Sequence, residues 1–269
     1  SKNSLRGTDP FISISWDEAE KIVSNELNRV KNKFGNASIF GGSYGWASAG
    51  RFHHAQSQLH RFLNCIGGYT RSKFTYSFAA AEAMVPHILG SYRAYLDTCT
   101  SWDSIEENTE LFICFGGVPL KNGQIAQGGT GSHNQKEKLI RSANAGIKFI
   151  NFSPLKSDLL DEVNGEWLAL RPNTDVAIML GLAYTLYKEK LYDDKFIEKY
   201  TEGFDTFLPY LKGDTDGIAK DANWASSISE IPSEKITSLA KEMSSKRTMI
   251  SVSWSLTRQD HGEQPFWAA

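Results

Sequence analysis

The sequence alternates between segments with a helical apolar period and short apolar runs that end in glycine or serine. Residues 17–34 predict a helix, because apolar side chains recur three and four positions apart at Ala19, Ile22, Val23, Leu27 and Val30. Trp16 and Gly35 are the predicted boundary residues of this helix. The run Ser38–Phe40 that follows is typical of a short strand leading into a glycine-rich loop.

Two further helices are predicted before residue 100. The pair Gly67-Gly68 is expected to end the first, whose apolar face carries Phe52, Ala55, Leu59, Phe62 and Leu63. The second is expected to begin near Ser77 and to run through Met84, with Pro86 disturbing it.

From Leu111 onward the pattern indicates strands and helices in alternation. Strands are predicted at residues 111–115, 147–152, 167–170 and 249–252, and helices at 135–145, 176–188 and 232–244. This order predicts an α/β fold in which a Rossmann-like parallel sheet is flanked by helices. Polar or glycine-rich loops follow the strands, and ligands of open α/β sheets bind at that edge.

Composition and charge narrow the class of protein. Of the 269 residues, 41% are hydrophobic and 22% are charged, which excludes a disordered, collagen-like or coiled-coil chain. The net charge of −2 supplies no large positive field for a nucleic acid. No apolar run approaches the roughly 18 residues that a transmembrane helix needs, so no membrane partner is expected. The chain has three cysteines, which excludes a four-cysteine iron–sulfur cluster within this segment.

Taken alone, the candidate motifs leave alternatives open. The loop 116–122 lacks a G-x-G-x-x-G fingerprint, so both a plain turn and a nucleotide-like ligand remain. Tyr44 and Trp46 either line a site or pack under the sheet. Ser77 is by position alone an N-cap hydroxyl. No zinc site is predicted, because no H-E-x-x-H pattern contains His53, His54, His60 or His87.

A resemblance to a known family favours the functional alternative for these motifs. It is carried by the runs Ile39–Trp46, Gly50–Ala55, Arg61–Thr70, Thr75–Ser77, Pro86–Gly90, Thr100–Trp102, Thr174–Gly181 and Arg258–Gln264. These runs cover essentially the whole chain. The sequence resembles the molybdopterin oxidoreductases of the dimethyl sulfoxide reductase family, and is nearest to the branch of biotin sulfoxide and trimethylamine N-oxide reductases.

The resemblance implies a metal centre and names its residues. Molybdenum is expected to be held by two molybdopterin guanine dinucleotides and by the serinate oxygen of Ser77, a donor that suits a hard, high-valent metal. Nitrate and formate relatives carry cysteine or selenocysteine there, so serine indicates the S-oxide and N-oxide branch. Tyr44 matches the family tyrosine whose hydroxyl faces the oxo group or the substrate oxygen. Trp46 matches the family tryptophan that lines the substrate pocket beside this tyrosine.

The resemblance also assigns the strand-end loops to the dinucleotides. Lys121, Lys156 and Arg258 are expected to supply positive charge, and Ser153 replaces an aspartate that is common in relatives. Residues expected to cradle the guanosine and phosphate parts are Phe115, Gly116, Gly117, Val118, Pro119, Leu120, Lys121, Asn122, Phe152, Ser153, Pro154, Leu155, Lys156, Ser157, Asn173, Thr174 and Asp175. Those expected to approach a pterin are Ser255, Leu256, Thr257, Arg258 and Gln259.

The expected function is molybdenum-dependent reduction of a small-molecule sulfoxide, such as biotin sulfoxide, or of an amine N-oxide, with electrons from an unidentified donor. The alternative is a nucleotide-binding or structural fragment without activity of its own. A nicotinamide-dependent dehydrogenase is a weaker rival, because the glycine fingerprint is missing.

The chain is expected to be a fragment of a larger multidomain molybdoenzyme. The family's chains are several times longer, and the helical pattern at residues 266–269 stops without a cap. Two domains are expected: a partial α/β domain at 1–102 that carries the molybdenum-ligand loop, and a truncated dinucleotide-binding domain at 103–269. The expected location is the cytoplasm, with the periplasm as the alternative if an export signal precedes Ser1.

Overall fold

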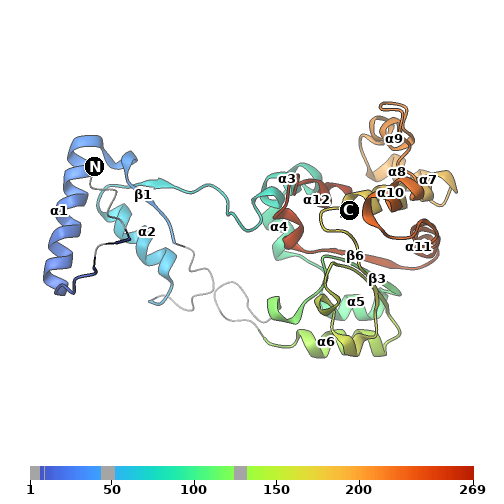
Figure 1. Cartoon of the computed structure of the whole chain (residues 1–269), viewed down its shortest axis with the longest axis horizontal. Coiled ribbons are helices and arrows are strands. Elements are labelled where there is room, and N and C mark those ends of the chain that lie inside the picture. The colour runs from blue at the N-terminus through green and yellow to red at the C-terminus, as the bar shows by residue number, and fades with distance from the viewer. Residues whose placement is uncertain (1–6, 9, 44–51, 124–131) are drawn as a thin grey trace. The chain divides into compact units, whose positions relative to one another are not determined.

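The computed structural model describes residues 7–8, 10–43, 52–123 and 132–269. Contacts within the chain divide it into two compact units, whose elements are drawn in Figure 1. The described residues up to Lys73 form unit 1, and those from Phe74 onward form unit 2. The expected domains at 1–102 and 103–269 stay a prediction.

Unit 1 contains the predicted first helix and a minimal parallel sheet. Helix α1 (Trp16–Phe34) begins one residue earlier than predicted, because the Ser15 hydroxyl accepts a hydrogen bond from the Glu18 amide and caps it. The other elements are the 3-10 turn η2 (Asn36–Ser38), strand β1 (Phe40–Gly41), helix α2 (Ala55–Cys65) and strand β2 (Thr70–Arg71). β1 pairs with β2 in parallel.

The predicted strand Ser38–Phe40 is wrong at its start. The Ser38 hydroxyl donates a hydrogen bond of 2.7 Å to the Gly35 carbonyl and so closes the turn η2. Serine competes with regular structure through such local bonds. The strand therefore begins only at Phe40.

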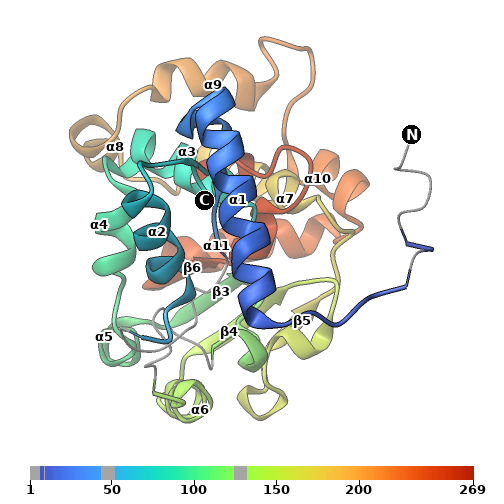
Figure 2. The same ribbon diagram turned by 90° about the vertical axis from the view of Figure 1, so that its left-hand side faces the viewer.

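Unit 2 is built on a four-stranded sheet in which every neighbouring pair is parallel, as predicted. Figure 2 shows the strands in their spatial order β5-β4-β3-β6. The strands are β3 (Leu111–Phe115), β4 (Lys148–Phe152), β5 (Glu166–Leu168) and β6 (Thr248–Val252). The predicted strand at 167–170 begins one residue earlier and ends at Leu168.

Strand β3 divides the core of unit 2 into two clusters. All five of its residues are buried, as expected for a parallel strand covered on both faces. Leu111, Ile113 and Phe115 pack with α7 (Asp175–Lys188), α10 (Ala222–Ser229) and α11 (Ser233–Ser245). Phe112 and Cys114 pack with α5 (Trp102–Asn108) and α6 (Gln135–Asn144). Figure 1 shows these two groups of helices on opposite faces of the sheet.

Unit 2 also contains helices outside these two groups. They are α3 (Ala79–Leu89), α4 (Tyr92–Asp97), α8 (Asp194–Tyr200), α9 (Phe204–Lys212) and α12 (Gln264–Ala268), with 3-10 turns η3 (Leu120–Asn122), η5 (Lys156–Asp158), η6 (Asp161–Val163) and η7 (Trp254–Thr257). Pro86 does not end α3, which continues beyond it to Leu89. Across the part of the chain that the structure describes, no helix combines the length and apolar character needed to cross a membrane.

Candidate functional site

The order of the strands singles out one edge of the sheet. β6 lies on one side of β3, whereas β4 and β5 lie on the other. The connection from β3 to β4 runs through α6 on one face, and the connection from β5 to β6 runs through α7, α10 and α11 on the other. The chain therefore changes direction between β3 and β6. Open parallel sheets bind ligands at the carboxyl ends of the strands beside such a point.

Two glycines let the strand-end loops meet at this edge. Gly116 and Gly117 both have left-handed backbone, with φ of 81° and 74°. A Cβ atom on Gly116 would lie 2.8 Å from the Ser253 Cβ, and one on Gly117 would lie 2.4 Å from the Asp158 carbonyl oxygen. Neither position can carry a side chain. The loops after β3, β4 and β6, which were predicted separately to contact the dinucleotides, are therefore in direct contact.

Ser77 lies at the same edge. Its carbonyl oxygen accepts hydrogen bonds from the Arg258 Nε at 2.8 Å and from the Thr257 Oγ1 at 3.2 Å. Both donors follow β6, so the fold brings the predicted metal ligand to the loop predicted to approach a pterin. The N-cap alternative for Ser77 is wrong, because α3 begins at Ala79 and Phe78 occupies the N-cap position.

The loop after β4 holds a carboxylate that sequence reasoning missed. The buried Ser153 donates its hydroxyl hydrogen to the Asp158 Oδ2 at 2.6 Å, and the Asp158 carbonyl accepts from the Val118 amide at 2.7 Å. Ser153 thus has a carboxylate five residues later as its partner. The only sequence signal was an acidic residue just beyond the predicted loop.

The three predicted cations differ in their surroundings. Lys121 Nζ lies 3.6 Å from the Asp158 Oδ1, and Lys156 Nζ lies 3.8 Å from the Asp161 Oδ1. Part of their charge is therefore already compensated. Within the described residues, no carboxylate lies within 4.0 Å of the Arg258 guanidinium. Arg258 is consequently the cation at this edge that is best able to attract an anionic ligand.

Asp175, the first residue of α7, is a buried carboxylate with an unsatisfied atom. Its exposed fraction is 3%, and its Oδ1 has no hydrogen-bond partner among the described residues. Burial raises the pKa of Asp175 to about 6, although a backbone hydrogen bond opposes the shift. Buried polar atoms are rarely left without partners. The neighbouring Thr174 donates its hydroxyl hydrogen to the Arg171 carbonyl and does not cap α7.

Three other predicted contact residues point into the core. The side chains of Phe115 and Phe152 stack with ring centroids 5.0 Å apart and are 1% and 0% exposed. Leu256 belongs to the same buried cluster. Only the backbone at these three positions is available to a ligand. Tyr44 and Trp46 lie outside the described residues.

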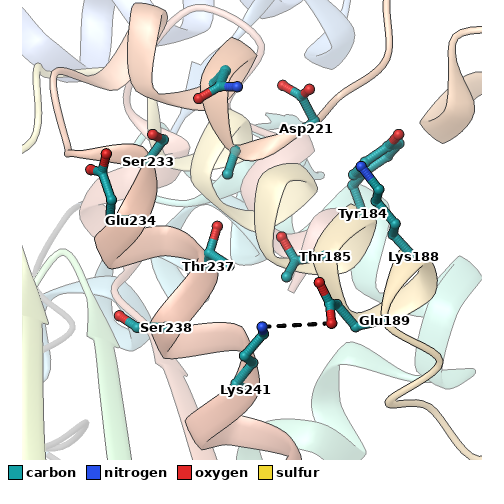
Figure 3. A pocket seen from close by; sticks show the side chains of 12 residues that line it. Tyr184, Thr185, Lys188, Glu189, Asp221, Ser233, Glu234, Thr237, Ser238 and Lys241 are labelled. Carbon is teal, nitrogen blue, oxygen red and sulfur yellow. Dashed lines mark ion pairs between the residues drawn. The ribbon is translucent and has the colours of Figure 1, made fainter.

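A cavity of about 480 Å³ lies elsewhere, between the end of α7, the start of α10 and one side of α11 (Figure 3). Lys241 crosses it to form an ion pair of 3.5 Å with Glu189. None of the residues predicted from the sequence lines this cavity. Its two lysines, Lys188 and Lys241, are outnumbered by the carboxylates of Glu189, Asp221 and Glu234, so its charge does not favour an anion. The loops at the β3 and β6 ends therefore form the better candidate site.

The chain is similar to several known proteins over nearly its whole length. The chain is 46% identical to a biotin sulfoxide reductase from Cereibacter sphaeroides over 98% of its length. It is 42% identical to a dimethyl sulfoxide/trimethylamine N-oxide reductase from Rhodobacter capsulatus and 40% identical to a trimethylamine-N-oxide reductase from Haemophilus influenzae. The chain spans about a third of each relative, with shares of 36%, 32% and 32%.

A solved structure shares the fold. The acetylene hydratase from Pelobacter acetylenicus superposes with a TM-score of 0.64 over 96% of this chain and 32% of its own, at 21% sequence identity. The model of one family, the molybdopterin oxidoreductases, matches residues 4–269. With nearly every residue matched, this chain belongs to the molybdopterin oxidoreductase family.

Proposed function

We propose that this chain forms part of a molybdenum-dependent reductase of sulfoxides or amine N-oxides, and that Ser77 supplies the protein ligand to the metal. The observation that carries the proposal is the position of Ser77, whose carbonyl is bonded to the loop after β6 at the ligand-binding edge of the sheet. Relatives at 46% and 42% identity are named for sulfoxide and N-oxide reduction. The substrate is accordingly proposed to be a small molecule of this class.

The residues at this edge fit a pterin dinucleotide in the guanine form. When bound, such a group with its metal supplies the two-electron chemistry by which a sulfoxide or N-oxide loses oxygen. Asp175 has a buried carboxylate oxygen without a partner, and guanine presents adjacent N–H donors that a carboxylate accepts. Gly116 and Gly117 bring the loops together without side chains between them. Arg258 provides positive charge for a phosphate or for the anionic pterin sulfurs.

Further parts of the proposal follow the family resemblance. Tyr44 is proposed to donate a hydrogen bond to the substrate oxygen, and Trp46 to form a wall of the substrate pocket. Replacing Tyr44 by Phe removes one hydrogen-bond donor. The activation free energy of turnover is expected to rise by about 1 to 3 kcal/mol. We further propose a cytoplasmic location, which cell fractionation tests directly.

The first experiment measures molybdenum by elemental analysis after expression in a host that makes the cofactor. It compares the 269-residue chain with a chain extended at both ends to the length of the relatives, called here the extended chain. Molybdenum near one atom per extended chain supports the proposal. If neither protein retains metal, the chain is a nucleotide-binding or structural module and the proposal fails.

The second experiment replaces the proposed ligand. In the extended chain, Ser77→Ala is expected to abolish turnover of a sulfoxide or to prevent metal retention. The matched control is Ser244→Ala, which changes an exposed serine that bonds only within helix α11. Turnover and metal content equal to those of the unaltered protein in Ser77→Ala would remove Ser77 from the metal centre.

A further inference from the structure

The turn that carries Ser77 is held by contacts on three sides. Before it, the Thr75 amide donates a 3.0 Å hydrogen bond to the Glu82 carboxylate of α3. At its centre, the Ser77 carbonyl accepts from Arg258 and Thr257. After it, the Phe78 ring lies 4.2 Å from the Trp254 ring and 5.9 Å from the Tyr92 ring, centroid to centroid. The turn is therefore fixed by side chains, not by regular secondary structure.

The backbone entering this turn is strained. Phe74 has a φ of 66°, a left-handed value that a bulky side chain rarely adopts. Such a conformation persists only where the surrounding contacts determine it. The contacts to the Ser77 carbonyl come from residues 180 and 181 positions away, so the folded sheet, and not the local sequence, sets the conformation of the turn.

The two donors to the Ser77 carbonyl are not equivalent. The Thr257 hydroxyl has one hydrogen and lies 2.7 Å from the Trp254 carbonyl but 3.2 Å from that of Ser77. The shorter contact takes the hydrogen most of the time. The Arg258 Nε, at 2.8 Å, has one hydrogen in a fixed plane, and its charge strengthens the bond. Arg258 is therefore the principal donor.

We propose that Arg258 is a positioning residue for Ser77: its Nε–H holds the Ser77 carbonyl and thereby fixes the direction in which the Ser77 side chain leaves the backbone. This inference rests on the proposed role of Ser77 as a metal ligand. It assigns to Arg258 a task other than the cofactor contact expected from the sequence. A lysine cannot take over this task, because its ammonium lies at the end of a flexible chain and lacks a planar N–H near the backbone.

The anchoring itself is tested on the 269-residue chain without any cofactor. Amide hydrogen exchange of residues 75–79 is compared in the unaltered protein, Arg258→Met, Arg258→Lys and Thr257→Val. Loss of a charged hydrogen bond is expected to speed exchange there by about tenfold or more in both arginine variants, and by much less in Thr257→Val. Exchange in strand β4 is the internal control and should not change. Unchanged exchange at 75–79 in Arg258→Met, or full rescue by Arg258→Lys, would overturn the inference.

The consequence for the metal is tested on the extended chain loaded with molybdenum. The electron paramagnetic resonance signal of the metal is expected to become broad or split in Arg258→Met, because the Ser77 ligand adopts more than one orientation, and to stay sharp in Thr257→Val. An unaltered signal in Arg258→Met contradicts the positioning role. If Ser77→Ala leaves the signal unchanged while Arg258→Met still speeds exchange at 75–79, the anchoring stands and the proposed ligand role of Ser77 fails.

Discussion

The two units of this chain bury their apolar residues to very different extents. In unit 2, all five residues of β3 are buried, and the helices of both faces complete two core clusters. In unit 1, helix α1 is amphipathic, yet none of its residues is buried, and Ile22 is 54% exposed. A helical pattern therefore predicts that a helix forms, whereas its burial depends on the partners that the remaining elements provide. Unit 2 contains enough partners to position a site, whereas Ile39 and Leu63 are the only buried large apolar side chains among the described residues of unit 1.

The largest difference between the two units is expected when one apolar side chain in each is shortened to alanine. Phe149→Ala removes a ring that is 2% exposed and stacks on Phe112, and it should lower the free energy of unfolding by about 3 to 5 kcal/mol. Ile22→Ala on α1 should change it by no more than about 0.5 kcal/mol. Urea unfolding followed by circular dichroism measures both. A comparable loss in Ile22→Ala would mean that the face of α1 is buried in solution.

Asp175 provides a second test, this time of a functional residue within the well-packed unit. Its folded pKa of about 6 lies above the usual value, so the native state binds the proton more tightly than the unfolded chain does. Ionisation of Asp175 therefore lowers the free energy of unfolding as the pH rises from about 4 to 6. Above pH 6 this loss stays constant. At pH 7, Asp175→Asn should stabilise the chain by about 3 kcal/mol, and this gain should vanish below about pH 4. A loss of stability at pH 7 would show that the carboxylate has a partner.

A smaller effect is expected at the buried Lys220, which is 2% exposed. Its Nζ bonds the Asp216 carboxylate at 2.7 Å and lies 4.4 Å from the Tyr210 ring centroid. Lys220→Met should cost about 1 to 2 kcal/mol, because the methionine keeps the ring contact but loses the charged hydrogen bonds. Lys212→Met is the control, since its ion pair with Asp214 is exposed and should contribute little. Equal losses in the two variants would argue against a special role for burial here.

The smallest effect concerns the polar contacts of unit 1. The Asn36 side chain donates to the Gly68 carbonyl at 2.8 Å and to the Ile66 carbonyl at 3.3 Å, which ties the end of α1 to the end of α2. Asn36→Ala should lower local stability by about 1 kcal/mol, seen as several-fold faster amide exchange in α1. The exposed Asn28, which lies within α1, is the control. Identical exchange in both variants would show that these bonds do not hold unit 1.

Much of the fold could be predicted from periodicity. The predictions for the strands of unit 2 and for α1, α6, α7 and α11 lie within two residues of the observed bounds, whereas α3, predicted to run through Met84, extends to Leu89. One misjudged feature depends on a local side-chain bond, in which the Ser38 hydroxyl closes a turn. Short helices such as α4 and α9 carry too few residues for a period to be recognised.

The candidate site was less predictable, because its parts meet only in three dimensions. Sequence and resemblance named Ser77 and Arg258 separately, but no pattern could indicate that the Arg258 Nε bonds the Ser77 carbonyl across 181 positions. Asp158 was missed because its role follows from its contact with Ser153. Phe115, Phe152 and Leu256 were expected to contact a cofactor, yet their side chains lie in the core. Phe115 and Phe152 are the last residues of buried strands, and Leu256 lies in the turn η7.

The most direct test of the central claim is molybdenum X-ray absorption on the extended chain, with and without the Ser77→Ala substitution. If Ser77 binds the metal, the spectrum of the unaltered protein contains one more oxygen ligand than that of the variant. Identical ligand shells in the two proteins would contradict the account, and the serine at the carboxyl edge of the sheet would then be a structural residue only.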